Sequence, residues 1–226
     1  MKMKIFCTSI ACSIVLLLAT PLLGGQDLSK YRTFSLGASL ATVLKHTNQK
    51  LADVKVTHSR PGLMQESTWW PPSISGTPYR PDTVEQMRFS FYEGELYKIS
   101  VVYDRASTEG LTAEDLVKSV TAKYGEAKYV ALAIDSPTEE NQRTVAWWED
   151  SQYSLNLARS SFTGAFELVI CSKRVNDEAE LALANALKLD KQEAPQREIA
   201  RQKKERDDGR AAAAKARAAN KSAFRP

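Results

Sequence analysis

The amino-acid sequence predicts an α+β fold in which two units, each a helix followed by antiparallel strands, form one layered domain ahead of a charged helical tail. Helical apolar spacing recurs in two short segments, and a stretch of alternating apolar residues follows each of them. The end of the chain instead becomes rich in Ala and charge. We therefore expect a domain over residues 26–175 and an Ala- and charge-rich tail, helical or disordered, over 176–226.

Residues 1–25 have the composition of an export signal. Two lysines precede an apolar stretch from Ile5 to Leu23, and the first acidic residue is Asp27. A basic start, an apolar stretch and small residues before a polar chain are typical of a secretory signal. This predicts a periplasmic or secreted protein after cleavage near Gly25. The apolar stretch is also nearly long enough to span a bilayer, so an uncleaved inner-membrane anchor over residues 5–23 is the alternative.

The first unit begins with a predicted helix, followed by a short strand around residues 54–56. The apolar residues Leu36, Leu40, Val43 and Leu44 recur at helical spacing, and a serine at position 35 or 39 is suited to the N-cap.

Residues 61–83 contain five prolines and predict a long irregular loop, because proline cannot donate a hydrogen bond within a central strand. Trp69, Trp70, Pro71 and Pro72 lie within this Pro/Trp-rich segment. Tryptophan is enriched at binding hot spots, and proline lowers the entropy cost of presenting it. These four residues are therefore our candidate partner-binding site, the alternative being that at least one indole packs onto the domain.

The stretch from Met87 to Asp104 predicts a half-buried β-hairpin rather than an exposed aromatic platform for a ligand. Its apolar residues alternate on both sides of a Glu-Gly turn signal. We expect a three-residue loop over 92–94, which would set Phe89 opposite Tyr97 with both rings on the core face.

The second unit repeats this order over residues 110–172. Thr112 and Asp115 predict the capped start of a helix and Gly125 its end. Strands are predicted within 144–159, on either side of turn residues 149–152, and over 165–175. Leu116 corresponds to Leu40 of the first helix, and the Trp pair at 147–148 corresponds to the pair at 69–70, which indicates a degenerate tandem repeat.

The segments FSLGASLATVLKHTNQ and GLTAEDLVKSVTAKYGEA, each leading into aromatic strands, resemble the units of two kinds of small exported protein. These are the SmpA/OmlA-type outer-membrane assembly lipoproteins and the tandem-unit β-lactamase-inhibitory proteins. The resemblance covers roughly residues 33–175 as architecture and includes no diagnostic motif. It implies an exported, non-enzymatic binding module of the cell envelope whose partner is a protein.

The tail carries most of the positive charge of the chain. Residues 196–226 contain ten Lys/Arg and four Asp/Glu, a net charge of +6, whereas the whole chain has +4. Arg201, Lys203, Lys204 and Arg206 are our candidates for contact with an anionic surface. Nucleic acid is not favoured as a partner, because the basic residues lack interleaved aromatics.

The sequence offers no recognisable reaction centre, so we predict a non-catalytic protein without cofactor or structural metal. His46 and His58 belong to no metal-binding motif. Cys171, which follows the apolar run FELVI, is interpreted as a small buried side chain rather than a reactive thiol. The alternative is a hydrolase-like enzyme whose site is assembled from dispersed residues.

Overall fold

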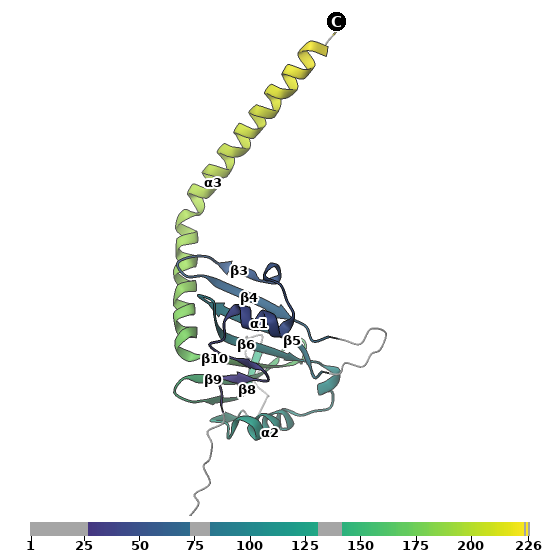
Figure 1. Ribbon diagram of the computed structural model, residues 1–226, viewed down its shortest axis with the longest axis vertical. Helices are drawn as coiled ribbons and strands as arrows, with labels where there is room; N and C mark the ends of the chain where they lie inside the picture. The colour runs from purple at the N-terminus through teal and green to yellow at the C-terminus, as the bar shows by residue number, and fades with distance from the viewer. Residues whose placement is uncertain (1–26, 73–81, 131–141, 224, 226) are drawn as a thin grey trace, which may run out of the picture.

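The chain forms an eight-stranded antiparallel sheet with helices on both faces, as seen in a computed structural model that describes residues 27–72, 82–130, 142–223 and 225 (Figure 1). Two short helices, α1 (Leu40–Thr47) and α2 (Ala113–Tyr124), pack on one face. The long helix α3 (Lys173–Ala223) begins against the other. The predicted α+β class is confirmed.

The strands of the first part of the sequence occupy one half of the sheet and those of the second part occupy the other. The order across the sheet is β3-β4-β5-β6-β10-β9-β8-β7, so the two halves meet at the pair β6–β10. A two-stranded sheet, β1 (Lys30–Tyr31) and β2 (Phe34–Ser35), precedes α1. The bounds of the eight strands are β3 (Lys55–His58), β4 (Met64–Trp69), β5 (Val84–Tyr92), β6 (Glu95–Tyr103), β7 (Tyr129–Val130), β8 (Gln142–Glu149), β9 (Tyr153–Ser160) and β10 (Phe166–Ser172).

The two short helices begin and end where local chemistry predicts. The Ser39 side chain accepts a hydrogen bond from the Thr42 amide at 3.3 Å and so caps α1. Thr112 and Asp115 form a reciprocal capping box at the start of α2, and Gly125 ends the helix with a φ of 83°.

The hairpin of β5 and β6 exists, but its predicted three-residue loop and register are wrong. Glu93 and Gly94 alone form the turn, both with positive φ, and Phe89 lies opposite Ile99. A β-bulge at Tyr97 absorbs the extra residue and turns this ring to the face covered by α3. Phe89 itself is fully buried, in agreement with a packed sheet rather than an aromatic platform.

The predicted irregular loop over 61–83 is also wrong in part. Residues 64–69 form β4, which pairs with β3 on one side and β5 on the other. The strand is possible because the prolines flank it at positions 61, 71 and 72 and none lies inside it. The remaining prolines, Pro78 and Pro81, lie outside the described residues.

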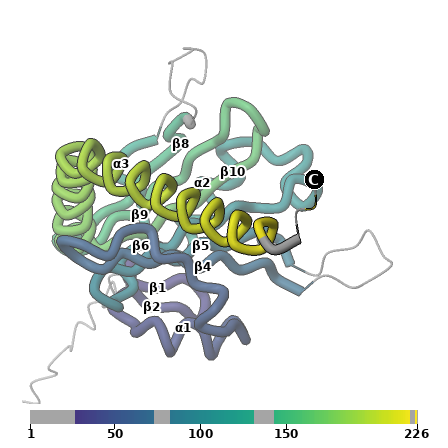
Figure 2. Tube along the Cα trace, turned by 90° about the horizontal axis from the view of Figure 1, so that it is seen from above, coloured from purple at the N-terminus to yellow at the C-terminus, as the bar shows by residue number. Residues whose placement is uncertain are grey.

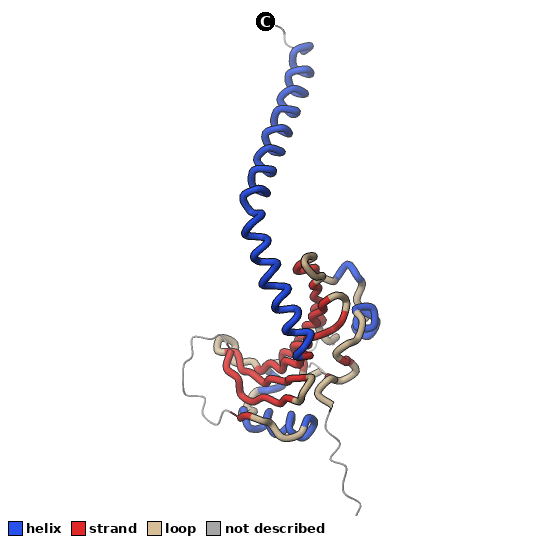
Figure 3. Tube along the Cα trace, turned by 90° about the vertical axis from the view of Figure 1, so that its left-hand side faces the viewer, coloured by secondary structure: helices blue, strands red, loops and turns tan. Residues whose placement is uncertain are grey.

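The helix α3 differs from the predicted tail in two ways. It begins at Lys173, and its first turns are part of the folded body, since Val175, Ala179 and Ala182 are buried. It also continues through Pro195, although proline usually interrupts a helix. Proline removes one helical hydrogen bond and bends a helix, and the axis changes direction part-way along α3 (Figures 1 and 2). Figure 3 shows that the helix continues well beyond the sheet.

Candidate functional sites

The structure divides the predicted Trp-Pro site between the core and the surface. Trp69 ends β4 and is half-buried, with its ring 6.3 Å from that of Phe34. Trp70, the first residue after the strand, is 60% exposed. Pro71 is half-buried and Pro72 is exposed. Trp70 and Pro72 are therefore the members of the set that a partner can reach.

The second Trp pair shows the same division. Trp148 is almost fully buried, and its Nε1 donates a hydrogen bond to the carbonyl oxygen of Gly125 at 2.8 Å. Trp147 is 45% exposed and lies against Tyr129, with ring centroids 5.2 Å apart. This pair of aromatic rings lies at the β7–β8 edge of the sheet.

The basic residues proposed for an anionic surface all lie on α3, but they are not equivalent. Arg201 is already paired with Glu198 and Glu205 on the same helix, at 2.7 and 2.6 Å. The hydrogen bond from Arg201 to Glu198 raises the pKa of the guanidinium above its ordinary value. Lys203 and Arg206 are exposed and point from one face of the helix, since they are three residues apart.

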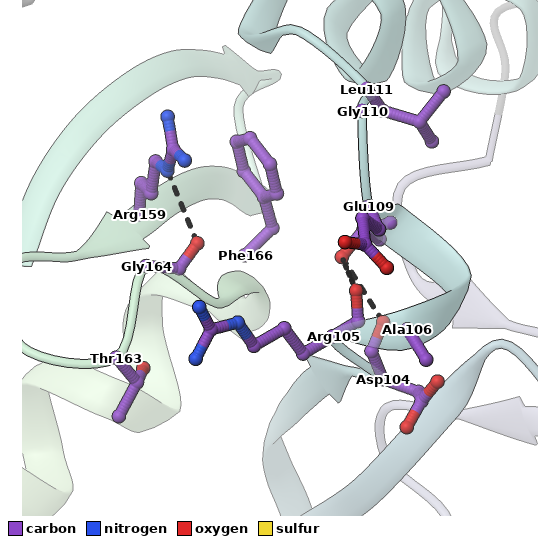
Figure 4. Close-up of a pocket in the computed structure, with 11 residues that line it drawn as sticks. Asp104, Arg105, Ala106, Glu109, Gly110, Leu111, Arg159, Thr163, Gly164 and Phe166 are labelled. Atoms are coloured by element: carbon purple, nitrogen blue, oxygen red, sulfur yellow. Dashed lines mark hydrogen bonds between the residues drawn. The ribbon is translucent and has the colours of Figure 1, made fainter.

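An arginine-lined cleft of about 650 Å³ opens between the end of β6 and the β9–β10 connection (Figure 4). Arg105 reaches from one wall toward Thr163, and Arg159 lies on the other wall beside Phe166. The Nε of Arg159 donates to the carbonyl of Gly164 at 3.1 Å, and its guanidinium carbon is 5.1 Å from the Phe166 ring centroid. These contacts fix the orientation of Arg159.

The chemistry available in this arginine-lined cleft is charge pairing. Arginine stays protonated at any physiological pH and donates without accepting. The cleft also contains two acids, but the Asp104 carboxylate accepts hydrogen bonds from the amide and hydroxyl of Ser107, both at 2.9 Å, at the start of the turn η2 (Ala106–Thr108). The cleft is thus lined by two arginines and two acids, whose formal charges balance.

A second cavity, of about 330 Å³, lies between α2, the sheet and the N-terminal segment, and we call it the tyrosine pocket. Tyr31, Tyr103 and Tyr124 contribute their rings to its walls. The Tyr124 hydroxyl donates to the Lys30 carbonyl at 2.9 Å. Burial raises the pKa of all three phenols above the ordinary value, so they remain neutral near pH 7.

Two basic side chains stand at this tyrosine pocket. Arg32 forms a bidentate ion pair with Asp82, with both N–O distances at 2.7 Å. This bond from Arg32 holds the pKa of Asp82 below its ordinary value. The Lys123 ammonium lies 5.2 and 5.0 Å from the ring centroids of Tyr31 and Tyr124. Burial, followed by the charge of Arg32, lowers the pKa of Lys123.

The histidines and the cysteine lie apart from both cavities. The His46 ring is 6.0 Å from Phe34, and His58 ends the edge strand β3. Cys171 is half-buried, with its sulfur 3.1 Å from the Ser154 hydroxyl. Across the part of the chain that the structure describes, no three His, Cys, Asp or Glu side chains form a group suited to hold a metal ion.

Sequence reasoning missed both cavities. The tyrosine pocket draws on β1, β6, α2 and β10, whose residues are up to 137 positions apart, between Tyr31 and Leu168. One signal was present, since each of the three tyrosines ends its element. Element ends gather at the rim of a sheet, where clefts form.

Within residues 27–72, 82–130 and 142–223, no helix has both the length and the apolar character needed to cross a membrane. Comparison of the chain with protein-family models, with curated proteins and with solved structures finds no match.

Proposed function

We propose that this chain is an exported, non-catalytic module of the cell envelope that binds a protein partner. The observation that carries the proposal is the arm formed by the end of α3. Every side chain from Ala194 to Lys221 is exposed, and 28 helical residues extend about 40 Å. Because the exposed end of α3 buries no side chains, it forms no enclosed site of its own. It extends from the sheet domain and can contact a partner at a distance from that domain.

The partner surface that we favour on the domain is the exposed pair Trp70 and Pro72. A large exposed indole beside proline has the composition of a binding hot spot. Trp69 is not part of this surface, because its side chain packs against the hydrophobic core.

The test is quantitative capture with the tagged mature chain from its own envelope fraction. Trp70→Ala should reduce recovery of the specific partner at least tenfold, since hot-spot truncations cost about 2 kcal/mol or more. Phe162→Ala removes another ring, 80% exposed, and is the matched control. Equal recovery with Trp70→Ala and with the control would remove this surface from the proposal.

We further infer that the two halves of the sheet are copies of one unit, as in the tandem-unit proteins that the sequence resembles. The strand order supports this inference, since each half is a helix followed by a four-strand meander. Trp69 and Trp148, the core-packed indoles of the two pairs, both lie toward the end of the second strand of their half. An experimental structure in which residues 40–103 and 113–172 cannot be superposed as whole units would contradict it.

A second candidate function is attachment to an anionic surface through the arm. Five exposed basic residues follow one another at steps of three, four, seven and four, which places them on one narrow face of the helix. These residues, which we call the basic stripe, are Lys203, Arg206, Arg210, Arg217 and Lys221. A juxtamembrane basic residue contributes about 1 kcal/mol to binding of anionic lipid.

Vesicles containing anionic phospholipid test this second function. Replacing Lys203 and Lys221 by Gln should weaken salt-sensitive retention of the mature protein by about tenfold or more. Replacing Lys204 and Lys215 by Gln removes the same charge from another face of the same helix. If both double variants lose retention on the vesicles equally, the net charge of the helix, rather than the arrangement of the basic stripe, is responsible for binding.

A further inference from the structure

The tyrosine pocket has the size and lining of a small-molecule site. Its volume of about 330 Å³ is at the lower end of the range for ligand pockets. A water-sized group takes about 30 Å³ in a liquid, so the pocket has room for a ligand of about ten non-hydrogen atoms. The cavity lies at the end of the sheet beside α2, and neither Trp70 nor a residue of the basic stripe is among the residues that line it.

The inner wall of the pocket is apolar. Leu168, Val120 and Leu116 form it, and all three side chains are buried. The phenol rings of Tyr31 and Tyr124 add two flat, largely apolar surfaces, each less than a tenth exposed. Such a wall favours an alkyl or aromatic group, because burial of apolar surface is favourable by roughly 25 cal/mol per Å².

The polar side of the pocket is cationic. Lys123 and Arg32 are the charged residues that line it, and no carboxylate is among the lining residues. Arg32 is already paired with Asp82, whereas Lys123 has no ion pair with any described acid. Its ammonium is instead held between two tyrosine rings, a cation–π contact that orients the charge without neutralising it. The charge of Lys123 is therefore available to an anion.

We propose that the tyrosine pocket binds a small amphipathic carboxylate, with the alkyl or aromatic body against Leu168 and Val120 and the carboxylate paired with Lys123. The Tyr124 hydroxyl already donates to the Lys30 carbonyl, so Lys123 is the group that pairs with the carboxylate. A cationic ligand is disfavoured, since it would meet both Lys123 and Arg32. This small-molecule function is separate from protein binding through Trp70 and from the arm.

Titration calorimetry of the mature protein with octanoate, which has ten non-hydrogen atoms, is the direct test. Octanoate should bind about tenfold or more tightly than octanol, since a hydrogen bond to a charged group favours the anion by this amount or more. Lys123→Met should abolish that preference while leaving octanol binding unchanged. Lys118→Met, on the exposed side of the same helix, is the matched control and should retain it.

The location of the ligand is tested independently by blocking the pocket. Ser119 is exposed and lines the cavity, so Ser119→Trp should fill its mouth and abolish octanoate binding without disturbing the core, as thermal unfolding would verify. Absence of octanoate binding to the unchanged protein at millimolar concentration would overturn the proposal. So would a preference for octanoate that survives Lys123→Met, or octanoate binding that survives Ser119→Trp.

Discussion

At the scale of single residues, Trp147 and Trp148 show how one step along a strand changes the role of an identical side chain. Trp148 fills the core and satisfies the Gly125 carbonyl, whereas Trp147 contacts only the edge ring Tyr129 among the aromatic groups described. Their alternation follows from strand geometry and could be predicted from the sequence. Which of the two is buried depends on the bulge between Thr144 and Ala146, for which the residue pattern contains no signal.

We expect Trp148→Phe to lower the free energy of unfolding by about 1–3 kcal/mol. The substitution leaves the part-buried Gly125 carbonyl without this donor and removes part of a packed side chain. Trp147→Phe, one residue away, should change it by less than about 0.5 kcal/mol. Urea denaturation of both variants measures the difference, and equal losses would contradict the assigned burial.

The ion pair between Arg32 and Asp82 predicts a defined dependence of stability on pH. Because the folded-state pKa of Asp82 is lowered, its contribution is fully present above the ordinary carboxyl pKa of about 3.9 and is lost as the pH falls through the folded value. Asp82→Asn should therefore cost up to about 1 kcal/mol at pH 7. The difference from the unchanged protein should begin to shrink below about pH 4 and disappear once the pH lies below the lowered folded-state pKa.

Denaturation of the two proteins from pH 7 to pH 2 measures this dependence. Glu85→Gln, which alters an exposed acid three residues away at the start of β5, is the control. A cost of Asp82→Asn that persists unchanged at pH 2 would show that the carboxylate charge is not what stabilises the N-terminal segment.

At the scale of the elements, the sequence predicts those whose ends are determined by neighbouring residues. The caps of α1 and α2 lie within three residues of the groups that they satisfy, so their signals are local. The strand β4 was missed because prolines on both sides of it concealed six residues that pair with two other strands. The bulge at Tyr97 was missed for a similar reason, because its ring packs on α3, which lies some 80 positions later in the sequence.

Pro195 is predicted to set the direction of the arm. Pro195→Ala restores the missing amide donor and removes the clash of the ring with the preceding turn, which together disfavour a helix by about 3 kcal/mol. We expect a straighter α3 and a changed distance between spin labels at Lys191 and Lys215, both exposed. Ala194→Gly, a change at the neighbouring position, should leave the bend in place. An unaltered distance in Pro195→Ala would assign the bend to another cause.

At the scale of the whole molecule, a binding pocket is harder to predict from the sequence than the fold class. The α+β class follows from periodicity along the chain, which each element carries by itself. The tyrosine pocket depends on how β1, β6, β10 and α2 are arranged around one cavity. The ion pair between Arg60 and Glu193 joins residues 133 positions apart. No pattern within a segment encodes such contacts, which is why the pocket and its lysine were found only in three dimensions.

We also expect removal of the arm to leave the unfolding midpoint of the sheet domain nearly unchanged, and removal of almost all of α3 to lower it. A chain ending at Ala194 retains Val175, Ala179 and the Glu193–Arg60 pair, and every side chain that it loses over residues 195–221 is exposed. Its unfolding midpoint should lie within about 2 °C of that of the full mature chain. A chain ending at Arg174 uncovers Met64 and Tyr97 on the second face of the sheet. We expect a loss of roughly 5–10 °C there, because buried apolar contacts disappear.

Differential scanning calorimetry of the two truncated chains beside the full mature chain distinguishes these outcomes. The two truncations differ by twenty residues of one helix, so composition alone does not explain a large difference between their midpoints. If the chain ending at Ala194 unfolded as early as the shorter one, the arm would be part of the cooperative unit. Its exposed helix would then need a contact, within the chain or between copies of it, and a midpoint that rises with protein concentration would identify the second kind.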